Sequence, residues 1–354
     1  MKTTLKLLCL LVSGVLNLQA AEDMVFRLPT DNDALYRGDN EGYFMYCDRW
    51  FEGKHSRPWQ AGSYGFTRNE LRISETQTIC TKLHEGIDVK SIKRDAKGEP
   101  LDKVRPIAPG VVAYVSNSKG ASNYGRYVVL AHELPEGTIY TLYAHLSAIS
   151  CEVGQELTPD DTLGILGYTG VGLNRVRAHC HLEICLMAHA EYHKFCPAAN
   201  KHGLFNGQNL IGFNAADVLL ACRDGQTFSL SAYFATLKEH YRVRVPYNGS
   251  MDLLKRHPFL YKGDWGITPP ALDIAFTAEG VPIAVYPATE AVQAPQVISC
   301  TPKPYLQKHC TANRINGNSK TAALTSGGKT FISRFLWVEP QPSSPVPEQP
   351  QQTP

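Results

Sequence analysis

The sequence lacks an excess of charge of either sign. It contains 35 lysines and arginines and 33 aspartates and glutamates in 354 residues, a formal net charge of +2. Two of the lysines, Lys2 and Lys6, lie in an N-terminal stretch that we expect to be removed, which leaves 33 basic against 33 acidic residues. Nucleic-acid binding draws its affinity from a basic face that displaces counterions from phosphates. We therefore expect no nucleic-acid partner.

Long hydrophobic runs are absent beyond the N-terminus. No later segment offers the roughly 18 uncharged apolar residues in a row that a transmembrane helix requires, so we expect no membrane span. The N-terminus combines the two lysines with a short apolar stretch, residues 7–18, and the small residue Ala20. This order is typical of a secretory signal peptide. The sequence thus predicts that residues 1–20 are removed and that the protein is exported, to the periplasm or the extracellular space.

Cysteine is not scarce, with ten in the chain and nine beyond the expected cleavage site. An exported protein with this many cysteines is expected to form disulfides, and an odd number leaves at least one thiol unpaired. Cys300 and Cys310 bracket a short loop with two prolines and are the pair that the spacing favours most. Cys180 and Cys185 are equally compatible with a role as small buried hydrophobic residues. The other pairings cannot be deduced from the sequence.

Short apolar runs separated by glycine-rich turns occupy residues 81–190. The runs at 107–115, 127–132, 138–145 and 179–184 have the composition of strands, and no long helical pattern lies between them. The sequence therefore predicts a mainly β fold with an antiparallel sheet in this part of the chain.

The regions on either side differ in composition. Residues 21–80 are rich in turn formers and aromatics, and we expect an irregular lead-in segment. Residues 191–338 show helical patterns at 214–220 and 229–241 together with strand patterns, which predicts an additional α+β region of unknown role. Residues 339–354 are rich in proline and glutamine and are predicted to form a disordered tail.

Four histidines and one aspartate are spaced so that one face of a sheet can collect them. His84 lies four residues before Asp88. His179 lies two residues before His181, and His145 lies two residues after a tyrosine. Residues an even number apart on a strand share a face. The alternative is a set of ordinary core or surface histidines, and the occurrence of all three stretches within about 100 residues weighs against it.

Two imidazoles and one carboxylate are a suitable ligand set for catalytic zinc. Three protein ligands leave the fourth position to a water molecule, whose pKa falls to about 7 on the metal. The zinc then supplies hydroxide near neutral pH and polarises the carbonyl under attack. Histidines that do not bind the metal can transfer protons or stabilise the developing oxyanion. The constellation therefore predicts hydrolysis without a protein nucleophile.

The three stretches resemble the lysostaphin/LytM family of zinc endopeptidases. They read His-x-Gly-x-Asp, Tyr-Ala-His-Leu-Ser and His-x-His-x-Glu in the family's order, and the resemblance covers roughly a third of the chain. Carried over by position, it implies that His84, Asp88 and His181 bind Zn²⁺. It also implies that His145 and His179 are catalytic histidines that do not bind the metal.

The resemblance also implies a fold and an activity. The family's fold is a small antiparallel β architecture, the duplicated hybrid motif, with a groove over the metal, and residues 81–190 would form this catalytic domain. The implied function is that of a secreted endopeptidase that hydrolyses peptide bonds in bacterial peptidoglycan, with zinc-bound water as the nucleophile. This chain departs from the family at Cys180 and Leu182, where the family more often has Leu and Phe. Both side chains are expected to face away from the zinc.

Other interpretations remain compatible with the sequence. An exported zinc protease acting on non-wall proteins would use the same chemistry. A catalytically silent member that binds the wall or regulates an amidase would share the fold, although loss of ligands marks that class and all five residues are present here. The basic run at 175–177 is either a solvated loop or a contact for substrate carboxylates. Four further histidines are predicted to be structural or exposed: His132, His189, His193 and His202.

Overall fold

The computed structural model describes residues 24–196, 202–302 and 310–337. The predicted signal peptide, residues 1–20, and the predicted tail, residues 339–354, lie outside the described residues. None of the helices within the described ranges has both the length and the hydropathy that a membrane span requires. All strand pairs within the sheets are antiparallel, and the predicted mainly β fold is confirmed.

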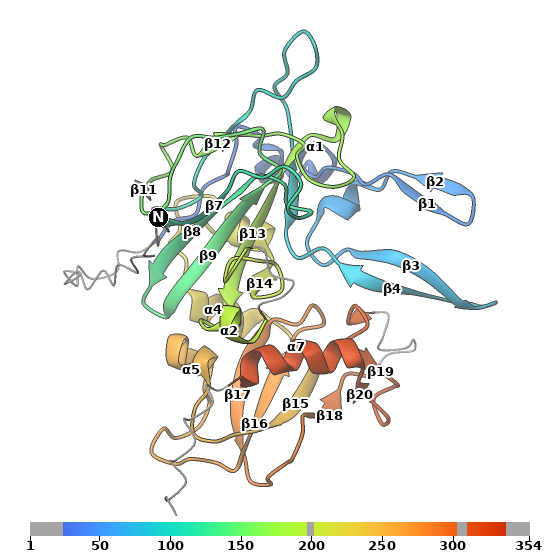
Figure 1. Ribbon diagram of the computed structural model, residues 1–354, viewed down its shortest axis with the longest axis vertical. Coiled ribbons are helices and arrows are strands. Elements are labelled where there is room, and N and C mark those ends of the chain that lie inside the picture. Colours follow the sequence, from blue (N-terminus) through green and yellow to red (C-terminus); the bar gives the residue numbers. More distant parts are fainter. Residues whose placement is uncertain (1–23, 197–201, 303–309, 338–354) are drawn as a thin grey trace, which may run out of the picture.

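A seven-stranded sheet forms the centre of the upper part of the molecule (Figure 1). Its strand order is β11-β7-β8-β9-β13-β14, and β5 pairs with β13 beside β14. Strand β13 is buried along its whole length because β9 borders one edge, while β5 and β14 share the other. The strands are β5 (Ile87–Lys90), β7 (Gly110–Ser116), β8 (Tyr127–Leu134), β9 (Gly137–Ala144), β11 (Glu156–Leu157), β13 (His179–Met187) and β14 (Leu210–Phe213).

Shorter elements surround this sheet. Two hairpins, β1–β2 and β3–β4, project from the same side of the molecule (Figure 1), in a segment that the sequence predicted to be an irregular lead-in. These elements are β1 (Arg49–Phe51), β2 (Lys54–Ser56), β3 (Thr67–Ser74), β4 (Gln77–Leu83), β6 (Lys103–Val104), β10 (Ala148–Ile149), β12 (Gly164–Ile165), η1 (Ala34–Arg37), α1 (Asn40–Tyr43), η2 (Trp59–Gly62) and η3 (Arg175–Arg177).

A second antiparallel sheet, of order β17-β16-β15-β18, occupies the lower part of the molecule, and α7 packs across it (Figure 1). Phe331 and Phe335 of α7 each contact Phe276 of β16, with ring centroids 5.8 Å apart. The elements of this region are α2 (Tyr192–Phe195), α3 (Ala215–Ala221), α4 (Leu230–Thr236), β15 (Tyr241–Pro246), α5 (Asp252–Arg256), η4 (Pro258–Leu260), β16 (Ala271–Phe276), β17 (Pro282–Ala288), β18 (Gln296–Cys300), β19 (Ile315–Asn316), β20 (Ala323–Leu324) and α7 (Ser326–Leu336).

The two helices predicted in this region differ in outcome. Asn214 caps α3 by accepting a hydrogen bond from the backbone N–H of Ala216, as its residue type favours. The helix predicted over 229–241 is shorter, because Leu237 adopts an extended conformation and ends α4. Tyr241 then begins β15 instead of completing a helical stripe.

The upper and lower parts share one continuous apolar core. Phe26, near the start of the described chain, contacts Phe228 with ring centroids 5.2 Å apart. Arg256 of α5 donates a hydrogen bond of 2.6 Å to the carbonyl of Met187 at the end of β13. Strand β14, which follows the predicted boundary at residue 190, belongs to the central sheet. The division at residue 190 stays a prediction.

The expected disulfides are not formed in the described part of the chain. The prediction of a disulfide between Cys300 and Cys310 is wrong. Cys300 is a buried free thiol at the end of β18, opposite Tyr241. The sulfur of Cys310 lies 3.3 Å from Nε2 of His240. Free thiols are found at Cys47, Cys80, Cys151, Cys180, Cys185, Cys196, Cys222 and Cys300.

Candidate active site and metal centre

Strand pairing brings the three predicted stretches together. Asp88 on β5 lies directly opposite His181 on β13, and β9, which ends one residue before His145, borders the other edge of β13. Gly86 lies so close to β13 that a Cβ there would be 2.5 Å from the carbonyl oxygen of Leu182. The glycine of the His-x-Gly-x-Asp stretch is therefore needed to let His84 and Asp88 approach the histidine strand.

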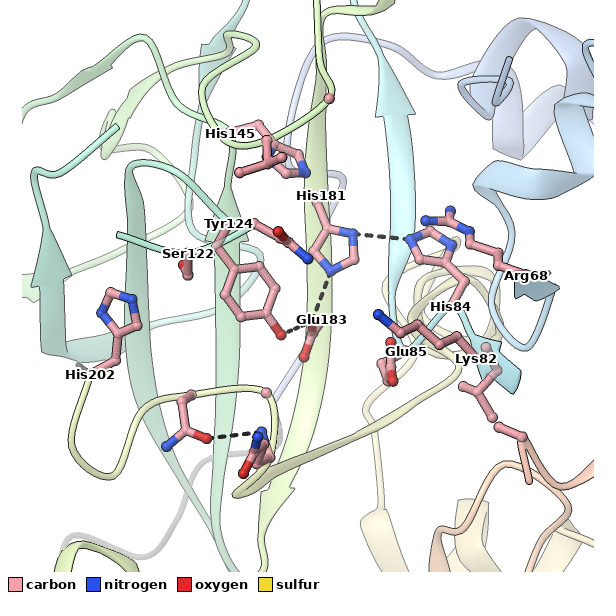
Figure 2. Close-up of a pocket in the computed structure, with 18 of the residues that line it drawn as sticks. Arg68, Lys82, His84, Glu85, Ser122, Tyr124, His145, His181, Glu183 and His202 are labelled. Carbon is pink, nitrogen blue, oxygen red and sulfur yellow. Dashed lines mark hydrogen bonds and ion pairs between the residues drawn. The ribbon is translucent and has the colours of Figure 1, made fainter. Parts of the chain in front are cut away.

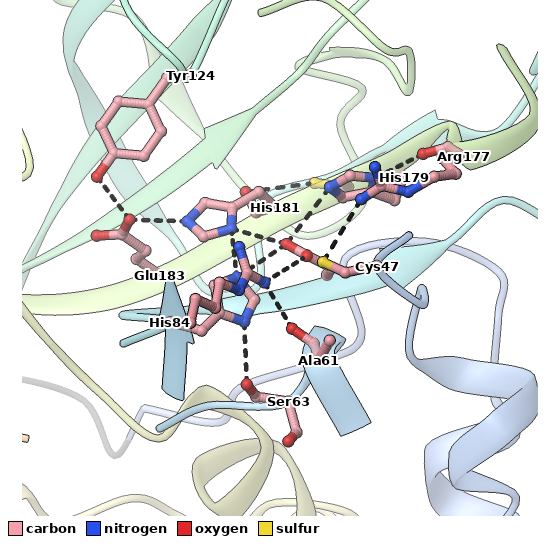
Figure 3. Close-up of polar contacts among 12 residues, drawn as sticks. Cys47, Ala61, Ser63, His84, Tyr124, Arg177, His179, His181 and Glu183 are labelled. Atoms are coloured by element: carbon pink, nitrogen blue, oxygen red, sulfur yellow. Dashed lines mark hydrogen bonds and ion pairs between the residues drawn. The ribbon is translucent and has the colours of Figure 1, made fainter. Parts of the chain in front are cut away.

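His84, Asp88 and His181 form a compact buried cluster. Figure 3 shows the imidazoles of His84 and His181 turned toward each other. Oδ1 of Asp88 lies 3.0 Å from Nε2 of His84 and 2.8 Å from Nδ1 of His181. The two imidazole nitrogens are 3.0 Å apart. One potential ligand atom from each residue thus points at the same small region.

The outer nitrogens of the two imidazoles have their own partners (Figure 3). Nδ1–H of His84 donates to the carbonyl of Ser63 at 3.0 Å. Nε2–H of His181 donates to Oε1 of Glu183 at 2.8 Å, and the hydroxyl of Tyr124 donates to the same oxygen at 2.7 Å. The outer nitrogen of each ring therefore carries a proton, and the inner nitrogen has a lone pair whenever the ring is neutral.

The charges around the cluster favour a cation at its centre. Burial lowers the pKa of His84 to about 4, so this imidazole is neutral at pH 7. Burial opposes the charged form of Asp88, but the neighbouring His84 and His179 hold the pKa of its carboxyl well below its usual range. Burial likewise opposes the charged form of His181, but hydrogen bonds to Asp88 and Glu183 raise its pKa to about 10. Without a metal ion, a proton on His181 therefore balances the two carboxylates.

His145 and His179 lie beside this cluster. Their ring centroids are 4.8 Å apart, and Nε2 of His179 is 3.4 Å from Oδ1 of Asp88. Each donates its Nδ1–H to a backbone carbonyl, of Thr169 at 2.9 Å and of Arg177 at 2.7 Å respectively, which leaves Nε2 as an acceptor. The pKa of His145 lies well below its usual range, mainly because the imidazole is buried and to a smaller extent because of the neighbouring histidines.

His145 has an unusual backbone conformation. Its φ is +63°, in the left-handed region that is uncommon for residues with a Cβ. Such a conformation costs on the order of 1 kcal/mol and persists where the surrounding structure requires it. Here it lets the chain turn out of β9 while the imidazole stays beside the cluster.

These residues lie in a cleft of about 1130 Å³ (Figure 2). All five predicted site residues line it. Its walls also come from the β3–β4 hairpin, the loops at 121–124 and 171–173, the segment at 206–208, and Ala312 and Arg314 of the C-terminal region. The cleft is large enough for an extended peptide to lie across the cluster.

The four histidines that we expected to be structural or exposed have different surroundings. His132 is buried within the sheet, where it bonds the carbonyl of Pro109 and the hydroxyl of Thr141. His189 bonds the carbonyl of Trp337, and His193 is exposed. His202 is buried and makes a hydrogen bond of 3.0 Å with the hydroxyl of Tyr114, as expected of a structural histidine, and it also lines the cleft.

The two arginines of the basic run also differ. Arg175 is half exposed and lies 3.5 Å from Glu99, whereas Arg177 lines the cleft. The guanidinium of Arg177 donates to the carbonyl of Tyr46 at 3.1 Å and contacts the sulfur of Cys47. Arg177 therefore anchors the N-terminal segment at the edge of the site.

Residues 82–192 match the model of peptidase family M23. This segment therefore resembles an M23 peptidase domain. It contains His84, Asp88, His145, His179 and His181, and the resemblance to the lysostaphin/LytM family is confirmed.

Solved structures of M23 peptidases are similar to this chain at low identity. The catalytic domain of lysostaphin from Staphylococcus simulans is 19% identical, with 44% of this chain and 86% of that chain covered and a TM-score of 0.25. A zinc-containing peptidase from Vibrio cholerae is 18% identical, with 39% and 43% covered and a TM-score of 0.23. The chain spans only 37% and 49% of two further matches, from Pseudomonas aeruginosa and Ruminococcus gnavus. No protein with a curated description matches the chain.

Proposed function

We propose that this chain is an exported, zinc-dependent endopeptidase that hydrolyses peptide bonds in bacterial peptidoglycan. The observation that carries the proposal is the convergence of His84, Asp88 and His181 in the cleft of an M23 domain, beside two further histidines. Export rests on the predicted signal peptide at residues 1–20.

The residues present fit a zinc ion. The three ligand atoms lie within 4.8 Å of one another, and the inner nitrogen of each imidazole is an acceptor when the ring is neutral. Two imidazoles and a carboxylate are a known ligand set for catalytic zinc with one open position. When bound, zinc supplies Lewis-acid chemistry that polarises the substrate carbonyl and activates water.

Glu183 and Tyr124 orient His181 in this proposal. A carboxylate that accepts from the outer N–H of a metal-binding imidazole fixes its tautomer and raises its basicity. Glu183 is 1% exposed and receives both the imidazole and the phenol hydrogen bonds at one oxygen. The two-residue spacing of His181 and Glu183 along β13 keeps Nδ1 of His181 directed at Asp88.

His145 and His179 supply proton transfer. Each has Nε2 free to accept a proton, because Nδ1–H is bonded to a backbone carbonyl. A neutral imidazole beside the cluster can take a proton from the attacking water and pass it to the leaving amine. After protonation, its N–H can also stabilise negative charge on the oxygen of the tetrahedral intermediate.

Digestion of purified cell wall, followed by mass spectrometry of the released fragments, tests the proposal. We expect new free amines, since peptide bonds are cleaved, and no new reducing sugars. Cleavage of soluble proteins without release of wall peptides would favour the exported-protease alternative. Wall binding without any cleavage would favour the catalytically silent alternative.

A further inference from the structure

Two basic side chains of the β3–β4 hairpin face the cleft together. Arg68 on β3 and Lys82 on β4 are directly opposite each other in the antiparallel register, and both line the cleft. Residues in this relation point to the same face of a hairpin, with Cβ atoms about 4.5–5.5 Å apart. Like charges placed this way are destabilising, so the pair is not explained by the stability of the hairpin.

Arg68 has its partners within the protein. Its guanidinium donates to the carbonyl of Ala61 at 2.5 Å and to Oδ2 of Asp88 at 3.3 Å. Its side chain is 32% exposed, and that of Asp88 is 4% exposed. The charge of Arg68 is therefore directed at the carboxylate of the metal centre.

Lys82 has no comparable partner. Within residues 24–196, 202–302 and 310–337, no carboxylate lies within ion-pair distance of its ammonium group and no acceptor is hydrogen-bonded to it. The residue is exposed, and Figure 2 shows its side chain extending into the cleft with the nitrogen at the inner end. An ammonium held in a cleft beside a second cation is a site for an anion.

We propose that Lys82 binds a carboxylate of the peptide substrate and makes the cleft selective for acidic peptides. This inference rests on the proposed function, because it places a substrate peptide across the metal centre. A charge-assisted hydrogen bond to an ammonium is stronger than a neutral one, and more so in a cleft than on an open surface. The bound carboxylate would also offset the repulsion between Lys82 and Arg68.

A second feature of the cleft supports an anionic substrate. Arg314 reaches the same cleft from the C-terminal region, with its guanidinium bonded to the carbonyl of Glu279 and stacked 4.3 Å from the ring centroid of Phe331. The cationic groups of the cleft thus enter from both the hairpin and the C-terminal region.

The test uses one cross-linked stem peptide prepared in two forms, with its carboxylates free or converted to amides. The full-length zinc-loaded protein should cleave the free form with a kcat/KM about tenfold higher, the scale of one charge-assisted hydrogen bond. In Lys82→Met the ratio between the two forms should fall to about one, mainly through KM. Lys82→Arg should retain the preference. Lys97→Met removes an exposed lysine outside the cleft and should keep the wild-type ratio.

The inference would be overturned if Lys82→Met kept the wild-type ratio of kcat/KM between the free and the amidated peptide while its unfolding temperature also stayed unchanged. If the wild-type protein cleaves neither peptide, the proposed function fails for this substrate. Equilibrium binding of the same two peptides, measured by fluorescence anisotropy on the same proteins, then decides the carboxylate inference separately. Equal affinity of the wild-type protein for both forms would reject it.

Discussion

Hydrogen bonding gives the four histidines of the candidate metal centre different properties although their side chains are the same. His84 and His181 donate their outer N–H groups away from the cluster and turn their inner nitrogens toward Asp88. His145 and His179 donate to backbone carbonyls and keep Nε2 available beside the cluster. The proposed division into two ligands and two proton carriers follows from these partners.

Removal of one proposed ligand should abolish stoichiometric zinc binding. His84→Ala, Asp88→Ala and His181→Ala each leave two of the three converging ligand atoms, so we expect zinc content to fall well below one per chain. Metal analysis of the purified variants checks this. His193→Ala changes an exposed histidine outside the cleft and serves as the matched control. Full zinc retention in all three ligand variants would reject the metal site.

Replacement of the other two histidines should separate catalysis from metal binding. His145→Ala and His179→Ala leave the three converging ligand atoms in place, so zinc content should match that of the wild-type protein. Turnover should fall at least about a hundredfold, because general acid–base transfer contributes roughly 10²–10⁴ in rate. Loss of zinc in His179→Ala with zinc retained in His181→Ala would mean that the two roles are exchanged.

At the scale of elements, composition predicted the strands that carry the site, whereas long-range packing was not predictable. The runs at 127–132 and 179–184 became β8 and β13 because their apolar residues fit a buried sheet. The two N-terminal hairpins were missed, since a stretch of aromatics and turn formers has no clear period. The helix predicted over 229–241 ended early because Leu237 is drawn into the extended path that leads to β15.

The residues of the site also divide into those that local sequence spacing predicted and those that only the fold brings in. The three histidine stretches could be identified because their spacing is local and their residue types are rare. Glu183 had a local signal, two residues after His181 on the same face of β13. Tyr124 and Arg68 had none, because they reach the centre from a loop and from a distant hairpin. Sequence spacing predicts groups that share a strand, and only the fold reveals those that arrive from elsewhere.

The buried histidine of β8 predicts an acid limit to stability. Burial lowers the pKa of His132 to about 4 in the folded protein, against about 6.5 in an unfolded chain. Its contribution is therefore fully present above pH 6.5 and is lost as the pH falls toward 4, by about 3 kcal/mol in total. Denaturant unfolding of the metal-free protein between pH 4 and 7 should show a shallower pH dependence in His132→Gln than in the wild type. The same pH dependence of the unfolding free energy in both proteins would contradict this role of His132.

At the scale of the whole molecule, the cleft depends on regions far apart in the sequence. Ser63 and Arg68 reach the candidate metal centre from the N-terminal segment, and Arg314 reaches the cleft from the C-terminal region. Phe26 packs against Phe228 within the same apolar core. The segment that matches the M23 model is therefore surrounded by elements that complete the walls of the cleft.

The shared apolar core leads us to expect one cooperative unfolding transition, although the sequence predicted an additional α+β region at 191–338. Arg256 joins the two parts, because it bonds Asp252 at 2.8 Å and the carbonyl of Met187 at 2.6 Å. Arg256→Ala leaves both acceptors without this donor, and we expect a loss of about 1–3 kcal/mol. Calorimetry should show a single peak that shifts as a whole to lower temperature. Lys255→Ala, an exposed neighbour on α5, should leave the peak unchanged. Two peaks, of which only one shifts in Arg256→Ala, would instead support an independent module.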